Sequence, residues 1–414
     1  MILRRVLIGL GIVALVTLGA WWVMESSDSS GPVEIRCGRV ITQPQVVAPF
    51  NAALILAPDG TIWGWGENSS GLLGPIQVRG RWNTPRRLDV GSDWVSLAAG
   101  GQYALGIKAD GSLWGWTFHP SGVSGQLGPY TNPPVRLAPG TNWVAVASGA
   151  AHALARRADG TLWAWGQNYS GQVGGNAITN YPAPMQLGTN RNWIGVAASA
   201  FGSLGLQSDG SLWQWGLVHM GFGEGPDVNL SAPARVGEGT NWVAISGGDF
   251  HFTARQRDGS LWVWGPNAHL VGSTDRQEPF RIDADTNWSA SANGNHLLAL
   301  KRDGTLWSCG REGSGETGRT PSDPSQGLAR IGERQDWMAV WAGPGISFGM
   351  TKDGTLWTWG VRLQEQPPRH ALWEKLSSWL PRWVKPVPSP RQVPSSPVPW
   401  PLARFVTNSV APSR

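Results

Sequence analysis

The sequence has 414 residues and contains 56 Gly, 31 Pro and 27 Trp, but only 15% of its residues are charged. This composition indicates a turn-rich all-β protein, and the regular spacing of the tryptophans excludes a low-complexity chain. The net charge of +5 is unevenly placed, because residues 361–414 carry +6, residues 1–40 carry +1 and the rest therefore carry −2. A central region that is not basic lacks the main electrostatic feature of nucleic-acid binding, so we expect no nucleic-acid partner.

The N-terminus reads as a membrane segment. Arg4 and Arg5 precede an uninterrupted apolar run over residues 6–24, which is just long enough to cross a bilayer as a helix. A cleaved signal peptide is the alternative, but residues 18–20 match a small-x-small cleavage site poorly. We favour an uncleaved signal anchor with a short linker over residues 1–31. It would place the rest of the chain outside the cytoplasm, in a bacterial periplasm or on the cell surface.

The remainder of the chain is organised around a repeated segment with the pattern Asp-Gly-x-Leu-Trp-x-Trp-Gly. Seven close copies begin at Asp59, Asp110, Asp159, Asp209, Asp258, Asp303 and Asp353. A period near 50 residues is typical of propellers and solenoids. Asp-Gly favours a two-residue primed turn, so each copy is predicted to form the tip of a β-hairpin.

The strand after each turn is apolar on both faces. In the third copy Leu162 and Ala164 share one face, whereas Trp163 and Trp165 share the other. Such a strand needs neighbours on both sides, which stacked blades provide. We therefore predict an all-β, seven-bladed β-propeller over residues 32–360. A tryptophan should head the first strand of six units, namely Trp94, Trp143, Trp193, Trp242, Trp288 and Trp337.

The third repeat unit carries a family resemblance. Its Gly149, His152 and Leu154, followed by Asp-Gly, Trp-x-Trp-Gly and the loop 171–174, resemble the regulator of chromosome condensation repeat. The resemblance implies a propeller fold. It leaves function open, because members serve as nucleotide-exchange factors, chromatin binders, parts of larger proteins or, in one secreted bacterial relative, a beta-lactamase inhibitor. The basic N-terminal tail of the eukaryotic exchange factor is missing here, which disfavours a nuclear function.

Candidate catalytic and metal chemistry is weak. The position seven residues before each Asp should form a ring, and it holds three histidines, His152, His251 and His296. Separate blades are too far apart for zinc coordination, so we expect these histidines to bond nearby backbone. The run 310–317 resembles a phosphate-binding loop, but Glu316 replaces the required lysine. We expect no catalytic residue, no metal and no cofactor, and hence no enzyme. An enzyme whose site is assembled from remote residues in the propeller channel is the less favoured alternative.

Two loops depart most from the repeat, at residues 118–128 and 217–225. They supply the candidate partner-contact residues Phe118, His119, His219 and Phe222. We expect a membrane-anchored propeller that binds an unknown protein partner through such loops. Binding of a glycan or cell-wall polymer is the alternative, because exposed aromatic rings stack on sugars.

The segment 361–414 is irregular and rich in Pro and Trp, and we expect it to complete or cover the last blade. Its Trp373, Trp379 and Trp383 are spaced to share one face of a short helix. Such a face suits either a plug packed on the ring or a surface that contacts a membrane or a partner, so these three tryptophans are further contact candidates.

Two segments compete to provide the outer strand of the seventh blade, residues 37–41 and residues 389–393. The two cysteines, Cys37 and Cys309, are too few for a disulfide framework. They are either separate thiols or a single bridge.

Overall fold

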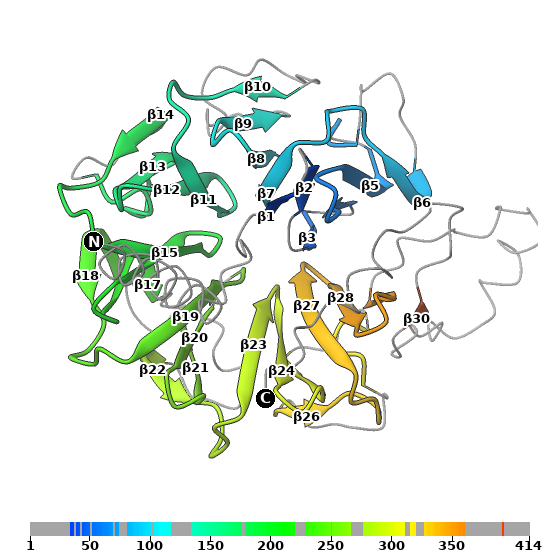
Figure 1. The fold of residues 1–414 in the computed structure, drawn as a ribbon. Coiled ribbons are helices and arrows are strands. Elements are labelled where there is room, and N and C mark those ends of the chain that lie inside the picture. The colour runs from blue at the N-terminus through cyan, green and yellow to red at the C-terminus, as the bar shows by residue number, and fades with distance from the viewer. Residues whose placement is uncertain are drawn as a thin grey trace, which may run out of the picture.

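The computed structural model describes residues 34–36, 39–41, 44–49, 52–68, 71–73, 81–101, 103–116, 134–175, 179–219, 228–249, 251–265, 276–310, 315–319, 327–360 and 391–392. These residues form seven four-stranded antiparallel sheets arranged in a ring, with an added two-stranded hairpin of β1 (Glu34–Arg36) and β2 (Arg39–Ile41) (Figure 1). They contain no helix. The predicted seven-bladed propeller is confirmed.

Each blade is built from four consecutive strands, here named A to D from the ring axis outward. The A strands are β3 (Gln45–Val47), β7 (Trp94–Ala99), β11 (Trp143–Ser148), β15 (Trp193–Ala198), β19 (Trp242–Gly247), β23 (Trp288–Asn293) and β27 (Trp337–Gly343). The B strands are β4 (Ala52–Leu56), β8 (Ala104–Lys108), β12 (His152–Arg157), β16 (Gly202–Gln207), β20 (Phe252–Gln256), β24 (His296–Lys301) and β28 (Ile346–Thr351). As predicted, a tryptophan begins six of the seven A strands.

The C strands carry the Trp-x-Trp motifs, and the D strands form the outer rim. The C strands are β5 (Ile62–Glu67), β9 (Leu113–Trp116), β13 (Leu162–Gly166), β17 (Leu212–His219), β21 (Leu261–Gly265), β25 (Leu306–Gly310) and β29 (Leu356–Gly360). The D strands are β6 (Arg81–Arg87), β10 (Val135–Arg136), β14 (Tyr181–Gln186), β18 (Val228–Arg235), β22 (Arg276–Arg281), β26 (Ala329–Arg330) and β30 (Arg391–Gln392).

The Asp-Gly turns differ from the expected two-residue primed type. In the third blade the Gly160 N–H donates to the Arg157 carbonyl (3.0 Å), and the Arg157 N–H donates to the Thr161 carbonyl (3.1 Å). The loop is therefore the three residues 158–160, a form in which the last residue is left-handed. Gly160 fills that place with φ +77°, and an added Cβ would lie only 1.9 Å from the Arg191 carbonyl oxygen. The prediction of a two-residue turn was wrong.

Neighbouring blades pack face to face, as the two-sided apolar pattern predicted. Trp165 packs with Tyr103 and Leu105 of the second blade, whereas Leu162 packs in a separate cluster with Trp193 of the fourth blade. Trp165 is fully buried and Trp163 is half-buried. The hydrophobic core is thus a series of inter-blade layers around the ring.

A belt of backbone hydrogen bonds joins successive blades near the axis. One N–H in an A–B connection donates to the carbonyl of the corresponding residue in the next blade. The members of this inter-blade belt are, in order, Gly101, Ala150, Ala200, Asp249 and Gly294. The four hydrogen bonds that join each member to the next have N···O distances of 3.3, 3.2, 2.9 and 2.9 Å. Because blades diverge outward from the axis, backbone contact of this kind fixes these connections close to it.

Glycine is required at one position of the belt and at one position beside it, because the blades approach so closely. A Cβ added to Gly149 would lie 2.4 Å from the Ser199 carbonyl oxygen, and one added to Gly294 would lie 2.3 Å from that of Gly343. Both distances are far below van der Waals contact, so a side chain at either position would push two blades apart.

The ring closes by packing of the seventh blade against the first. Phe348 meets Trp65 edge-on at a centroid distance of 6.2 Å, within a cluster that also contains Val46 and Ile346. The strand β30 pairs with β29 as the outer strand of the seventh blade, and it lies within the candidate segment 389–393. Residues 39–41 pair instead with β1, so they do not take that place.

The predicted membrane segment at residues 6–24 lies outside the described residues and stays a prediction. Within the described ranges no helix has the length and apolar character needed to cross a bilayer. Cys309 is a buried free thiol, and burial raises its pKa to about 12. Cys37 lies outside the described residues.

Candidate functional site

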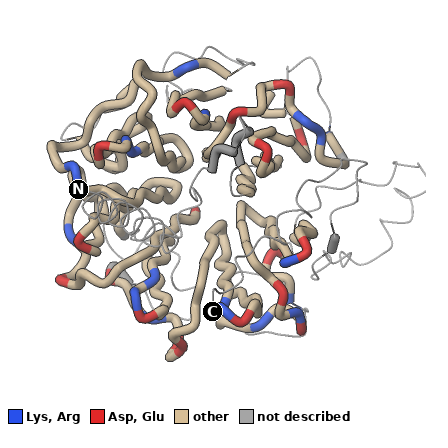
Figure 2. Tube along the Cα trace, in the orientation of Figure 1, with Lys and Arg blue, Asp and Glu red and all other residues tan. Residues whose placement is uncertain are grey.

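The antiparallel order of the strands gives the ring two different faces. The B–C turns and the D–A connections lie on one face, here called the turn face, and the A–B and C–D connections lie on the other, here called the loop face. Lys and Arg are interspersed with Asp and Glu around the ring rather than gathered in one sector (Figure 2). Neither sign of charge therefore singles out one group of blades.

The polar groups of the turn face are bonded to one another within each blade. In the third blade Asp159 Oδ1 accepts from the Thr161 N–H (3.1 Å) and hydroxyl (2.7 Å), and Thr161 Oγ1 accepts from the Trp163 indole N–H (2.9 Å). The hydroxyl of Thr161 lowers the pKa of Asp159, which keeps it ionised. The same chain of bonds recurs in Asp59–Thr61–Trp63, Asp110–Ser112–Trp114, Asp209–Ser211–Trp213, Asp258–Ser260–Trp262 and Asp303–Thr305–Trp307.

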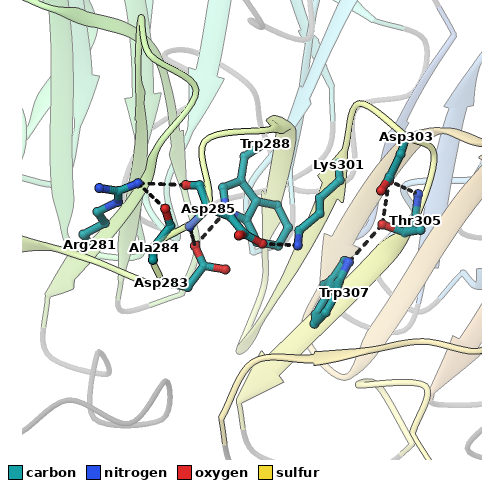
Figure 3. Close-up of polar contacts among 9 residues, drawn as sticks. All are labelled: Arg281, Asp283, Ala284, Asp285, Trp288, Lys301, Asp303, Thr305 and Trp307. Carbon is teal, nitrogen blue, oxygen red and sulfur yellow. Dashed lines mark hydrogen bonds and ion pairs between the residues drawn. The ribbon is translucent and has the colours of Figure 1, made fainter.

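A cationic side chain covers the tryptophans in several blades. In the sixth blade the Lys301 ammonium lies 4.7 Å from the Trp288 ring centre and 4.1 Å from that of Trp307, and it also pairs with Asp285 (Figure 3). Lys108 and Arg157 take the same place in the second and third blades. These indole faces are engaged within the chain, which leaves them poorly suited to stacking on a sugar.

Connection length separates the two faces more clearly than charge does. Six D–A connections have six residues each, at 88–93, 137–142, 187–192, 236–241, 282–287 and 331–336, and six of the seven B–C turns have four. The C–D connections instead range from eight residues to 30, at 68–80, 117–134, 167–180, 220–227, 266–275, 311–328 and 361–390. Variation is therefore confined to the loop face.

All the predicted contact residues fall in, or at the edge of, these variable connections. Phe118 and His119 lie between β9 and β10, Phe222 lies between β17 and β18, and His219 ends β17. The backbone of His219 pairs with Val228, whereas its side chain and the other residues lie outside the described residues. The same holds for the three candidates between β29 and β30, which are Trp373, Trp379 and Trp383. The connections that carry them belong to the second, fourth and seventh blades, which are not adjacent in the ring.

The ring histidines bond the next blade rather than nearby backbone. His152 Nε2 lies 2.9 Å from Ser203 Oγ, and Ser203 in turn donates to the Gln172 carbonyl (2.8 Å). Because that hydroxyl proton is used, the imidazole must donate from Nε2. His296 of the sixth blade makes the same kind of contact. Its Nε2 bonds Ser347 Oγ in the seventh blade, and Ser347 donates in turn to the Glu316 carbonyl.

Burial sets the protonation state of these histidines. Desolvation lowers the pKa of His152 and of His296 to about 3, and that of His251 to about 4. His251 contacts Asn293 Oδ1 at 3.1 Å. Among the described residues no group of three His, Cys, Asp or Glu side chains could hold a metal ion. The bonding that these rings make is structural and joins blades.

Sequence reasoning missed the serines that bond these histidines. Ser203 and Ser347 each follow the ring position of the blade after a histidine blade. A comparison of consecutive repeats, rather than of each repeat with the average, would have shown this pairing for two of the three histidines. The fifth blade uses Asn293 instead, which lies at the end of an A strand.

Comparisons with known proteins agree with this architecture. Two models of the regulator of chromosome condensation (RCC1) repeat match residues 143–172 and 159–206, so the repeat identity predicted from the third unit is confirmed. A search of curated proteins found no match.

Solved structures of similar fold include Prp20p from Saccharomyces cerevisiae, described together with its binding to Gsp1p and histones. It has a TM-score of 0.67 and 20% identity, over 82% of this chain and 86% of that chain. Human WBSCR16 is similar as well, with a TM-score of 0.66 and 19% identity, over 81% of this chain and 94% of that chain. At these identities the likeness establishes the fold alone.

Proposed function

We propose that this propeller of regulator of chromosome condensation repeats is a protein-interaction module whose partner binds the loop face. The observation that carries the proposal is the confinement of length variation to the C–D connections. Binding residues in repeat scaffolds lie on loops that a rigid framework positions. The turn face has uniform connections whose polar groups are already paired, so it offers few groups to a specific partner.

A protein partner fits this molecule better than a glycan or a nucleic acid. In the part of the chain that the structure describes, many tryptophans are buried between blades and several others are covered by Lys or Arg. Residues 41–360 sum to a charge of −2, which disfavours a polyanion. The yeast protein Prp20p, of similar fold, binds Gsp1p and histones, and this precedent supports a protein partner without naming it.

The proposal includes a location. The apolar run over residues 6–24 would anchor the chain, and Arg4 and Arg5 would stay in the cytoplasm, which puts the propeller outside it. A periplasm-active reporter fused after Arg414 should give signal, whereas a cytoplasm-only reporter should not. The reverse pattern would refute the outward orientation.

A capture experiment with the full chain tests the binding face. Two double variants, Phe118→Ala with His119→Ala and His219→Ala with Phe222→Ala, alter the loop face. Arg191→Ala is the matched control on the turn face, where its ion pair with Asp159 is exposed and contributes little to stability. Proteins captured from solubilised membranes should be lost with at least one double variant and kept with the control. Loss with Arg191→Ala alone would place the site on the turn face, and binding only to a polysaccharide panel would favour the glycan function.

A further inference from the structure

One outer strand carries a cation that the repeat does not require. The second-last residue of each D strand pairs with the residue after the first tryptophan of the C strand, and in five blades it is apolar: Val135, Met185, Ala234, Phe280 and Ala329. Arg86 of the first blade and Arg391 of the seventh blade occupy this position instead. These two blades meet where the ring closes, so a cation at this position is confined to the closure.

The following position of the D strand has a structural role, whereas that of Arg86 has none in the repeat. The counterparts of Arg87 donate from the guanidinium to a carbonyl of the following D–A connection, namely Arg136, Arg235, Arg281 and Arg330. Among the described residues Arg86 forms no hydrogen bond and no ion pair. Its guanidinium lies over the Trp82 ring instead, 5.3 Å from the ring centre. The bonding of the propeller therefore does not account for Arg86.

The surface around Arg86 is locally basic, although the ring as a whole is not. The strand β6 lies on the outer rim (Figure 1), and its exposed arginines are Arg81, Arg86 and Arg87. Two carboxylates are near in the chain or sheet: Glu67, whose backbone pairs with Arg81, and Asp89 beyond the strand. Across the closure, the segment 361–414 that contains β30 adds a charge of +6. An arginine resting on the half-buried Trp82 combines an apolar body with a charged tip, which is typical of membrane interfaces.

The chain enters the propeller at this same blade. The hairpin of β1 and β2 precedes β3 of the first blade, and β2 lies against β7 of the second blade. Residues 25–33 are all that separate the apolar run 6–24 from this hairpin. Fully extended, a linker of that length spans about 30 Å. The proposed anchor therefore holds the hairpin, and the first blade beside it, near the bilayer surface.

We propose that the outer strand of the first blade contacts the headgroups of an anionic bilayer through Arg86 and Trp82. The inference rests on the proposed membrane location, and it adds the class of lipid that the propeller meets. A guanidinium donates two parallel hydrogen bonds to a phosphate, and an anionic leaflet attracts basic residues close to its surface. Contact through the rim leaves the loop face open to the protein partner.

The first test asks whether the two arginines serve the fold. Arg86→Val with Arg391→Ala introduces residue types that other blades carry at this position, so the full chain should melt at the parent temperature in neutral nanodiscs. Arg191→Ala with Arg257→Ala is the control, because it removes the same charge from exposed positions on the turn face. A fall of several degrees confined to the first pair would mean that these arginines hold the ring closed, and it would overturn the proposal.

The second test follows amide hydrogen exchange in residues 81–87 by mass spectrometry. The full chain is held in nanodiscs of phosphatidylcholine, either alone or mixed with phosphatidylglycerol. Exchange should be slower with phosphatidylglycerol, and high salt should reduce the difference. Each basic residue near an anionic surface strengthens the contact about fivefold, so Arg86→Val with Arg391→Ala should weaken it about 25-fold and abolish the slowing. The control pair should retain it.

Three results would overturn the lipid contact in distinguishable ways. Equal exchange in both lipids, or slowing that survives in Arg86→Val with Arg391→Ala, would refute it and leave the proposed function standing. Slowing in neutral nanodiscs only after captured proteins are added would assign the strand to an acidic protein instead. A chain that fails to enter nanodiscs would refute the membrane location together with this inference, whereas the capture experiment would still test protein binding.

Discussion

Acid should unfold this propeller through its three buried histidines. In the folded chain the pKa values of His152, His251 and His296 lie at about 3, 4 and 3, whereas the ordinary value is 6.5. The unfolded chain therefore takes up protons below pH 6.5 that the folded chain refuses, so stability is present above that pH and is lost as the pH falls. At pH 5 the loss is about 2 kcal/mol for each histidine, or about 6 kcal/mol for all three.

A loss of that size rivals the whole stability of a typical domain, which is about 5 to 15 kcal/mol. Urea unfolding followed by tryptophan fluorescence at pH 7.5, 6.5 and 5.5 should show a midpoint that falls steeply below pH 6.5. Replacing all three histidines with Gln, whose amide can donate as Nε2 does, should remove most of that slope. An equally steep loss in the triple variant would refute the histidine mechanism and point to carboxylates instead.

Three further predictions concern the core, the belt and the ring closure. Trp165→Ala should destabilise the fold by about 3 to 5 kcal/mol in urea unfolding, and Trp163→Ala by less, because only Trp165 is fully buried; equal losses would contradict this. Gly294→Ala should lower the melting temperature because its Cβ would clash with the Gly343 carbonyl, and an unchanged value would show that the blades can shift. Truncation after residue 366 removes β30, so light scattering should reveal association through the exposed edge of β29, whereas a monomer of unchanged stability would show that β30 is dispensable.

The repeat by itself determined the architecture of this protein. Strand alternation and turn chemistry act over a few residues, so Leu162-Trp163-Ala164-Trp165 after Asp159-Gly160 predicts a strand apolar on both faces without any tertiary information. Seven copies at a nearly constant period then require seven similar blades. The sequence also located the variable segments, because departures from a repeat are visible wherever the repeat is strong.

Tertiary structure decided everything that depends on contact between blades. Asp-Gly suits more than one turn, and the Gly160 approach to Arg191, from a connection some 30 residues away, accompanies the three-residue form. The partner of His152 is Ser203 in the next blade, and the inter-blade belt joins connections that lie about 50 residues apart in the sequence. Local patterns fix the shape of one blade, whereas packing sets the spacing between blades. That spacing decides which polar groups find hydrogen-bond partners within the chain and which remain available to bind another molecule.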